Sequence, residues 1–166
     1  NQVGDLDVTD HLTIDGGGST LSAASLDRAV HVRSTTADLS GLVVTGVTTY
    51  GVTAEASALS LFEVEVRDAP YSGVALFGGS LDLRSTTIAR SGSQGVVAQG
   101  PGTLKISDST IADGGSTAIQ VSGGVSATVI AASVAGEKDA FVVKQALPQL
   151  RVRDEWLATP DRAETE

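Results

Sequence analysis

The chain has 166 residues, of which 41% are hydrophobic and only 4% aromatic, so its apolar mass comes mainly from Val, Ile, Leu and Ala. This composition excludes a disordered chain and suits closely stacked strands better than a core of large rings. The 11 basic residues are scattered among 20 acidic ones, giving a net charge of −9, so we expect no nucleic-acid partner, which would need clustered basic residues. The absence of cysteine excludes disulfides and thiolate metal sites.

A short apolar segment around Val8, in the stretch LDVTD, begins a series that returns along most of the chain. Many of its members start with Gly-Val or Ala-Val, and they recur at a nearly constant interval. The anchor positions are Val30, Val52, Val74, Val96, Ile119 and Val142. Self-similarity at a constant period of this size indicates a repeat architecture.

Two further apolar columns keep the same spacing, which gives three short segments in each repeat. The second column runs through Leu39, Leu61, Leu83, Ile106, Val129 and Val152. The third runs through Val44, Val66, Ile88, Ile111, Val134 and Leu157. Apolar and polar residues alternate within the segments, which is typical of strands, and turn residues such as Gly, Ser, Asp and Thr separate them.

Three strands per repeat predict an all-β chain that forms a single-stranded right-handed parallel β-helix, or solenoid. We expect about six coils of about 22–23 residues each and three short parallel sheets. A left-handed hexapeptide helix would need a shorter turn of about 18 residues. The β-helix domain is expected to span residues 1–157, and residues 158–166 are expected to be a frayed, charged tail.

The first repeat is longer than the others and gathers residue types used in acid–base catalysis. The step from Leu12 to Leu39 exceeds the usual interval, which places about five extra residues between LTIDGGGSTL and LDRAVHV. The catalytic candidates here are Asp15, Asp27, His31 and Arg33. A structural interpretation is also open: Asp15 starts the turn DGGG and bonds its own backbone, and His31 is a surface residue of the first sheet. The acids and histidines could supply metal ligands, but no ligand spacing assigns a metal site.

The middle repeats are expected to carry little chemistry. Thr86 and Ser109 should form a short hydroxyl stack inside the helix. The outward column of the middle sheet is expected to hold Ser40, Ser60, Asp82, Lys105, Thr128 and Arg151. In this column Asp82 and Lys105 should pair across adjacent coils, and no outward column supplies two adjacent acids.

Aromatic residues are few, and they are the candidates for contacts with a ligand. The binding candidates are Tyr50, Tyr71, Phe77 and Trp156. Trp156, the single Trp, lies beside Leu157 at the end of the last repeat, where Pro148 and Pro160 restrict continued pairing. We expect it to cap the last coil, with an aromatic platform for a sugar as the alternative.

The stretches LTIDGGGSTL, LSGLVVTG, RSTTIARSGSQGV and SDSTIADGGSTAI, within residues 8–157, resemble the right-handed parallel β-helix repeat family, the superfamily of pectate lyases and related proteins. The resemblance implies the fold. It implies no single function, because the superfamily includes lyases, glycosidases, tailspikes, adhesins and non-catalytic surface proteins. An enzyme of the pectate lyase kind would hold calcium between converging acids, so calcium is expected only if the chain is an enzyme, and otherwise no cofactor.

Short, even repeats favour a non-catalytic extracellular or cell-surface module for adhesion, assembly or glycan contact. Two alternatives stay open. The first is a polysaccharide lyase or glycoside hydrolase-like enzyme, either complete or truncated. The second is a structural unit that assembles end to end through its N-terminal coil. The expected partner is a polysaccharide or another protein. No run of about 18 apolar residues occurs, so we expect no membrane span. No signal peptide is visible, and secretion or surface display presupposes that one has been removed.

Overall fold

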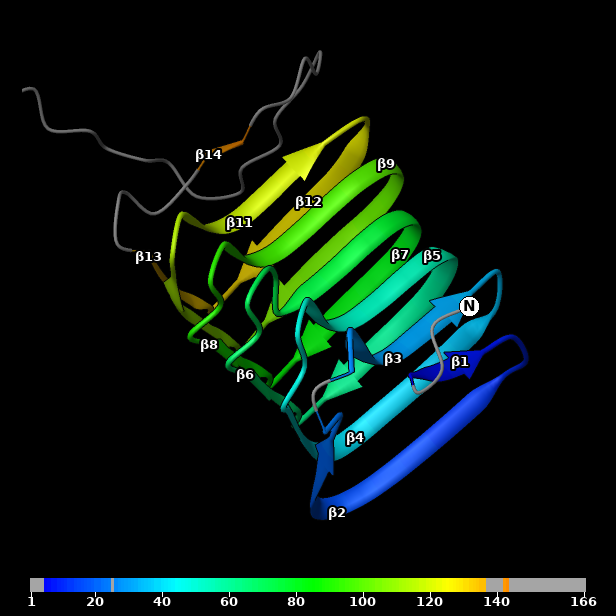
Figure 1. Cartoon of the computed structure of the whole chain (residues 1–166). Coiled ribbons are helices and arrows are strands. Elements are labelled where there is room, and N and C mark those ends of the chain that lie inside the picture. Colours follow the sequence, from blue (N-terminus) through cyan, green and yellow to red (C-terminus); the bar gives the residue numbers. More distant parts are fainter. Residues whose placement is uncertain (1–4, 25, 137–141, 144–166) are drawn as a thin grey trace, which may run out of the picture.

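The computed structural model describes residues 5–24, 26–136 and 142–143. In these ranges the parallel strands stack as a β-solenoid of about six turns (Figure 1). The predicted all-β solenoid is therefore confirmed. The predicted domain limit at residue 157, the tail 158–166 and Trp156 lie outside the described residues.

Each turn of the solenoid adds one strand to each of three sheets. The first sheet stacks β1 (Leu6–Val8), β3 (Arg28–Arg33), the first parts of β5 (Tyr50–Phe62), β7 (Val74–Arg84) and β9 (Gln94–Ser107), then β11 (Thr117–Ser122) and β14 (Val142–Val143). The second stacks β2 (Leu12–Ser22), β4 (Thr36–Thr45), the later parts of β5, β7 and β9, and β12 (Val125–Ile130). The third stacks the ends of β2 and β4 with β6 (Glu65–Arg67), β8 (Thr87–Ala89), β10 (Thr110–Gly114) and β13 (Ser133–Gly136).

The first and second sheets form two broad layers, and the third closes one corner with short strands (Figure 1). The predicted columns line the space between them. In the first sheet the column Val30, Val52, Val74, Val96 and Ile119 is in register. In the second sheet Leu39, Leu61, Leu83 and Ile106 are in register and at most 1% exposed. Like side chains thus stack directly on one another, and no turn buries its apolar face without its neighbours.

A column of glycines explains why the repeats begin with Gly-Val. Gly51, Gly73 and Gly95 lie where the third sheet meets the first, and a Cβ atom on each would fall 2.3–2.4 Å from a side-chain carbon of the third sheet. Those carbons belong to Val66, Ile88 and Ile111. The corner therefore admits only hydrogen at these positions, which lets the third-column side chains fill it.

The long first repeat is real, but its register differs from the prediction. Leu6, not Val8, pairs with Val30, and Leu12 pairs with Ala37 rather than with Leu39. At the second sheet, paired residues are 25 positions apart at Leu12–Ala37 and 23 apart at Ser19–Leu42, so a glycine-rich bulge in the DGGG turn absorbs two residues. The separation is 22 at Arg28–Tyr50, so only one extra residue, not about five, lies between Ser22 and Arg28.

Two other register predictions are also wrong. Val142 pairs with Gln120 instead of Ile119, a slip of one residue that exchanges the two faces of a strand. In the outward column of the second sheet, Asp38 rather than Ser40 pairs with Ser60. The constant step of 22 residues leads from Ser60 to Asp38, so the period itself gives the correct residue and the choice of Ser40 departed from it.

Candidate functional site

The sequence candidates from the first repeat separate into two places. His31 and Arg33 lie on β3, with Asp27 just before it, whereas Asp15 lies on β2 in the second sheet. The backbone N–H of Gly17 donates to Asp15 Oδ1 at 3.2 Å, which is the turn geometry of the structural interpretation. Arg33 is exposed at the end of β3 and lies in register with Glu55.

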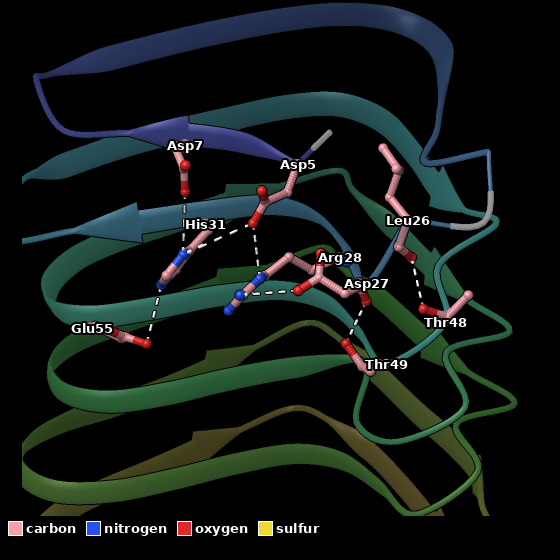
Figure 2. Close-up of polar contacts among 9 residues, drawn as sticks. All are labelled: Asp5, Asp7, Leu26, Asp27, Arg28, His31, Thr48, Thr49 and Glu55. Atoms are coloured by element: carbon pink, nitrogen blue, oxygen red, sulfur yellow. Dashed lines mark hydrogen bonds and ion pairs between the residues drawn. The ribbon is translucent and has the colours of Figure 1, made fainter. Parts of the chain in front are cut away.

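His31 is the centre of a group of charged side chains on the outer face of the first sheet (Figure 2). Its Nδ1 lies 3.4 Å from Asp7 Oδ1 and 4.0 Å from Asp5 Oδ2. On the other side of the ring, Nε2 lies 3.1 Å from Glu55 Oε1. We call Asp5, Asp7, Asp27, Arg28, His31 and Glu55 the His31 cluster.

The imidazole of His31 is buried, with 7% of the side chain exposed, so its expected place as a simple surface residue is wrong. Alternation along β3 does point it away from the core, but acidic side chains from the neighbouring strands β1 and β5 surround it. The contact to Glu55 has ion-pair distance without hydrogen-bond geometry, and Nε2 is left without a hydrogen-bond partner.

Arg28 holds the acidic side of the cluster together. Its Nε lies 2.9 Å from Asp5 Oδ2, and its Nη2 lies 3.0 Å from Asp27 Oδ2. The Asp5 side chain is only 4% exposed. A carboxylate so deeply buried needs charged or polar partners, and Arg28 supplies one of them.

The turn that presents Asp27 and Arg28 is anchored on the next coil. The hydroxyls of Thr48 and Thr49 donate to the carbonyls of Leu26 and Asp27, and the Thr49 backbone N–H also donates to Asp27 at 2.8 Å (Figure 2). These bonds fix the start of β3, and with it the orientation of the Asp27–Arg28 pair.

The candidates chosen from the sequence did not include four members of this cluster: Asp5, Asp7, Arg28 and Glu55. A constant period places Thr9 beside His31, whereas the longer first coil places Asp7 there. Glu55, by contrast, lies one regular repeat after Arg33 and was accessible from the repeat itself. The sequence signal was a glutamate on the next strand of the same sheet, two positions beyond the residue opposite His31.

The aromatic candidates Tyr50, Tyr71 and Phe77 come together on the same outer face. The rings of Tyr50 and Tyr71 stack with centroids 6.0 Å apart, and Phe77 meets Tyr50 edge-on at 6.5 Å. Tyr71 is 56% exposed and Phe77 is 36% exposed. We call these three residues the aromatic cluster. The fourth candidate, Trp156, lies outside the described residues.

The aromatic cluster covers part of the outward column of the first sheet. Tyr50 begins β5, whereas Phe77 lies five positions further along the neighbouring strand, so their rings can meet only over the residues between. Thr53 and Ala75 occupy that outward column and are at most 1% exposed. The first sheet therefore has a small apolar layer on its outside as well as on its inside.

Polar groups border the aromatic cluster on the following coils. The Ser72 hydroxyl donates to Gln94 Oε1 at 2.9 Å, and Gln94 Nε2 donates to Gln120 Oε1 at 2.8 Å. On the preceding coils lies the His31 cluster, since Arg28 is in register with Tyr50 and Glu55 with Phe77. One face thus carries charges, rings and amides in succession.

A second group of polar residues lies on the outer face of the second sheet. Asp38, Ser60 and Asp82 share one column and line a shallow hollow. Asp82 is in register with Lys105, as predicted, but its ion pair is with Arg84, at 2.8 Å. The hydrogen bond to Asp82 raises the pKa of the Arg84 guanidinium.

Comparison of the chain with protein-family models, with curated proteins and with solved structures finds no match. Across the described ranges, no helix has the length and apolar character needed to cross a membrane. The functional conclusion therefore depends on the geometry of the two clusters.

Proposed function

We propose that the protein is a non-catalytic module, secreted or displayed at a cell surface, that contacts glycans through the outer face of its first sheet. The aromatic cluster is the observation that carries this proposal. Phe77 exposes ring surface from β7 and Tyr71 from the connection before it, and the ring of Tyr50 contacts both of them. Adhesion or assembly would follow from the same contact when the glycan belongs to another surface.

The chemistry of a sugar suits this face. A pyranose ring has an apolar C–H surface that packs on aromatic rings, and hydroxyl groups that need hydrogen-bond partners. The amides of Gln94 and Gln120, beside the rings, supply donors and acceptors. The proposal is compatible with the predicted pectate lyase-like superfamily, whose members include non-catalytic surface proteins.

A glycan array followed by titration of the retained glycans tests the proposal. We expect Tyr71→Ala and Phe77→Ala each to weaken binding about fivefold or more, because each removes ring contact area worth about 1 kcal/mol. Phe62→Ala is the matched control, since Phe62 is 45% exposed but lies at the end of β5 on the second sheet.

Two results would contradict glycan contact through this face. One is that no glycan is retained. The other is that Phe62→Ala weakens binding as much as Phe77→Ala, which would place the contact elsewhere or make it non-specific.

For the alternative that the protein is a glycoside hydrolase-like enzyme, the candidate carboxylates lie on the outer face of the second sheet, away from the aromatic cluster. Asp38 and Asp82 lie two coils apart on one face, which separates their Cα atoms by about 10 Å at ordinary strand spacing. Hydrolysis of a glycosidic bond uses two carboxylates of which one donates a proton, and one of these two, Asp82, is held in an ion pair with Arg84 at 2.8 Å. Turnover of a polysaccharide, with or without calcium, that is lost in Asp82→Asn would overturn the non-catalytic proposal.

A further inference from the structure

The three side chains Asp5, Asp7 and His31 present metal-ligand atoms to one point. One carboxylate oxygen from each aspartate and one imidazole nitrogen all lie within 4.8 Å of one another. Asp7 lies on β1 and His31 on the adjacent strand β3, where the two residues pair in register, and Asp5 lies directly before β1. Strand pairing therefore fixes the position of Asp7 relative to His31.

The distances are close to those that a bound ion requires. Ligand atoms about 2.1 Å from a tetrahedral Zn²⁺ lie about 3.4 Å from one another. Asp7 Oδ1 and His31 Nδ1 already have this separation of 3.4 Å, and Asp5 Oδ2 lies 4.0 Å from the same nitrogen. Asp5 must approach His31 by about half an ångström, and the two aspartate oxygens, which lie within 4.8 Å of each other, must reach the same 3.4 Å separation by side-chain rotation.

A carboxylate stands at the opposite edge of the His31 ring, where a metal-bound histidine has its hydrogen-bond partner. Glu55 Oε1 lies 3.1 Å from Nε2, while Nδ1 faces the two aspartates. A carboxylate behind a ligating imidazole fixes the tautomer that leaves the other nitrogen free for the ion, and it raises the basicity of that nitrogen. The imidazole is 7% exposed, so Nδ1 is presented to the two aspartates from a buried ring, while Nε2, which has no hydrogen bond, faces Glu55 on the other side.

The charge balance of this region also favours a cation. Four carboxylates face or border the ring, from Asp5, Asp7, Asp27 and Glu55, and two guanidinium groups accompany them, from Arg28 and Arg33. With a neutral imidazole the region carries an excess of two negative charges. One divalent ion between the aspartates would neutralise that excess and relieve the repulsion between two close carboxylates.

We propose that Asp5, Asp7 and His31 form a binding site for a divalent transition metal and that the bound ion links β1 to β3. Among these metals, Zn²⁺ is the best fit. The imidazole ligand favours zinc over calcium, which prefers six to eight oxygen ligands. Asp7, with 33% of its side chain exposed, leaves the site open to solvent, so water completes the coordination. This proposal departs from the sequence prediction that no metal site exists, and it does not depend on glycan binding.

Zinc binding to the full chain, freed of metal with a chelator, tests the site by competition with a chromogenic indicator. We expect one Zn²⁺ per chain and at least a 100-fold loss of affinity in His31→Ala. Asp7→Asn should also lose affinity and disturb the fold less, because this side chain is partly exposed. Glu55→Gln should weaken binding about 10-fold, because Glu55 acts on the ligand rather than on the ion.

The chain provides matched controls. His11 is the only other histidine, and its Nδ1 lies 2.6 Å from Thr36 Oγ1, away from the His31 cluster. Glu65 is an exposed glutamate side chain on the third sheet, 3.4 Å from Arg67. His11→Ala and Glu65→Gln should therefore bind zinc as the unaltered chain does.

A spectroscopic measurement locates the bound ion. In His11→Ala the single remaining imidazole gives one pair of ¹⁵N resonances, and we expect Zn²⁺ to shift the Nδ1 resonance of His31. The melting temperature of the chain should rise with zinc concentration, and Asp7→Asn should abolish that rise. A chain that retains no zinc, or that binds it equally well with and without His31 or Asp7 in folded variants, would overturn the proposal.

Discussion

The hydroxyl groups of Thr86 and Ser109 show how single residues satisfy the backbone inside the solenoid. Both side chains are buried in the third-sheet corner, as the sequence predicted. Ser109 Oγ accepts from the backbone N–H of Thr86 at 3.1 Å and donates to the Ser107 carbonyl at 2.7 Å. Thr86 Oγ1 lies within 3.1 Å of the carbonyls of Leu61 and Arg84. Short hydroxyl side chains therefore bond main-chain groups that an apolar neighbour would leave unpaired.

Removal of one hydroxyl should have a measurable cost. Ser109→Ala leaves the buried N–H of Thr86 without its acceptor, and we expect the free energy of unfolding to fall by about 1–3 kcal/mol. Urea denaturation followed by circular dichroism measures this change. Ser126→Ala, at an exposed position of β12, is the control and should change stability by less than about 0.5 kcal/mol. Equal effects of the two substitutions would show that the buried hydroxyl is not needed.

At the scale of the strand, the glycine column sets how closely the corner can pack. Gly73 has an ordinary backbone conformation, since its φ is not positive, so only space restricts the residue type there. The equivalent position of the next coil but one is Ala118, which is fully buried. The corner thus widens toward the C-terminal coils, where a methyl group is accommodated.

Gly73→Ala isolates this steric effect. The added Cβ would lie 2.3 Å from Ile88 Cγ2 and 3.0 Å from the Gly95 carbonyl oxygen, so the corner must expand. We expect a loss of stability of about 1–3 kcal/mol, which is typical of overpacking. Chemical denaturation gives the value, and the double variant Gly73→Ala with Ile88→Val should recover part of it. No loss in the single variant would mean that the corner is looser than the contacts indicate.

Most strand positions could be predicted because the repeat itself encodes them. Val52, Val74 and Val96 follow one another at a constant interval, and stacking like on like fixes their register. The first coil could not be placed in the same way. Its bulge at the DGGG turn breaks the interval, and no local signal shows how many residues a bulge absorbs.

The residues of the candidate site could also be predicted only in part. The sequence pointed to His31 and Asp27 because of their residue types, and to Tyr50, Tyr71 and Phe77 because aromatic residues are rare in this chain. It did not indicate that Asp5 and Asp7 meet His31, because that contact depends on the register of the irregular coil. Burial of His31 was also beyond prediction, since it comes from charged side chains on neighbouring strands.

For the whole molecule, stacking in one dimension predicts a gradient of stability. Each coil contacts only the coils before and after it, so the central strands β5, β7 and β9 have neighbours on both sides. Among the described residues, β2 pairs with β4 alone. The ends should therefore open more often than the centre.

Hydrogen exchange followed by mass spectrometry should reveal this gradient. We expect the amides of residues 52–62 and 74–84 to exchange slowest, and those of residues 6–22 to exchange faster by about 10-fold or more, which corresponds to a difference in opening free energy above about 1.4 kcal/mol. Uniform protection from residue 6 to residue 130 would contradict independent opening of the ends and would indicate a single cooperative unit.

The whole-turn interval between Val52 and Val74 also determines how the outer surface can change. Excision of residues 52–73 would leave Gly51 before Val74, keep the Gly-Val pair, and bring Val74 beside Val30. The alternation of apolar side chains in the interior would be unchanged. On the outer face, however, His31 would lie beside Ala75, and Arg33 would lie beside Phe77 in place of Glu55. An excision at this place of one residue more or fewer would instead turn polar side chains inward. Gain or loss of whole turns thus gives surface groups new neighbours, while the side chains in the core beneath them keep their register.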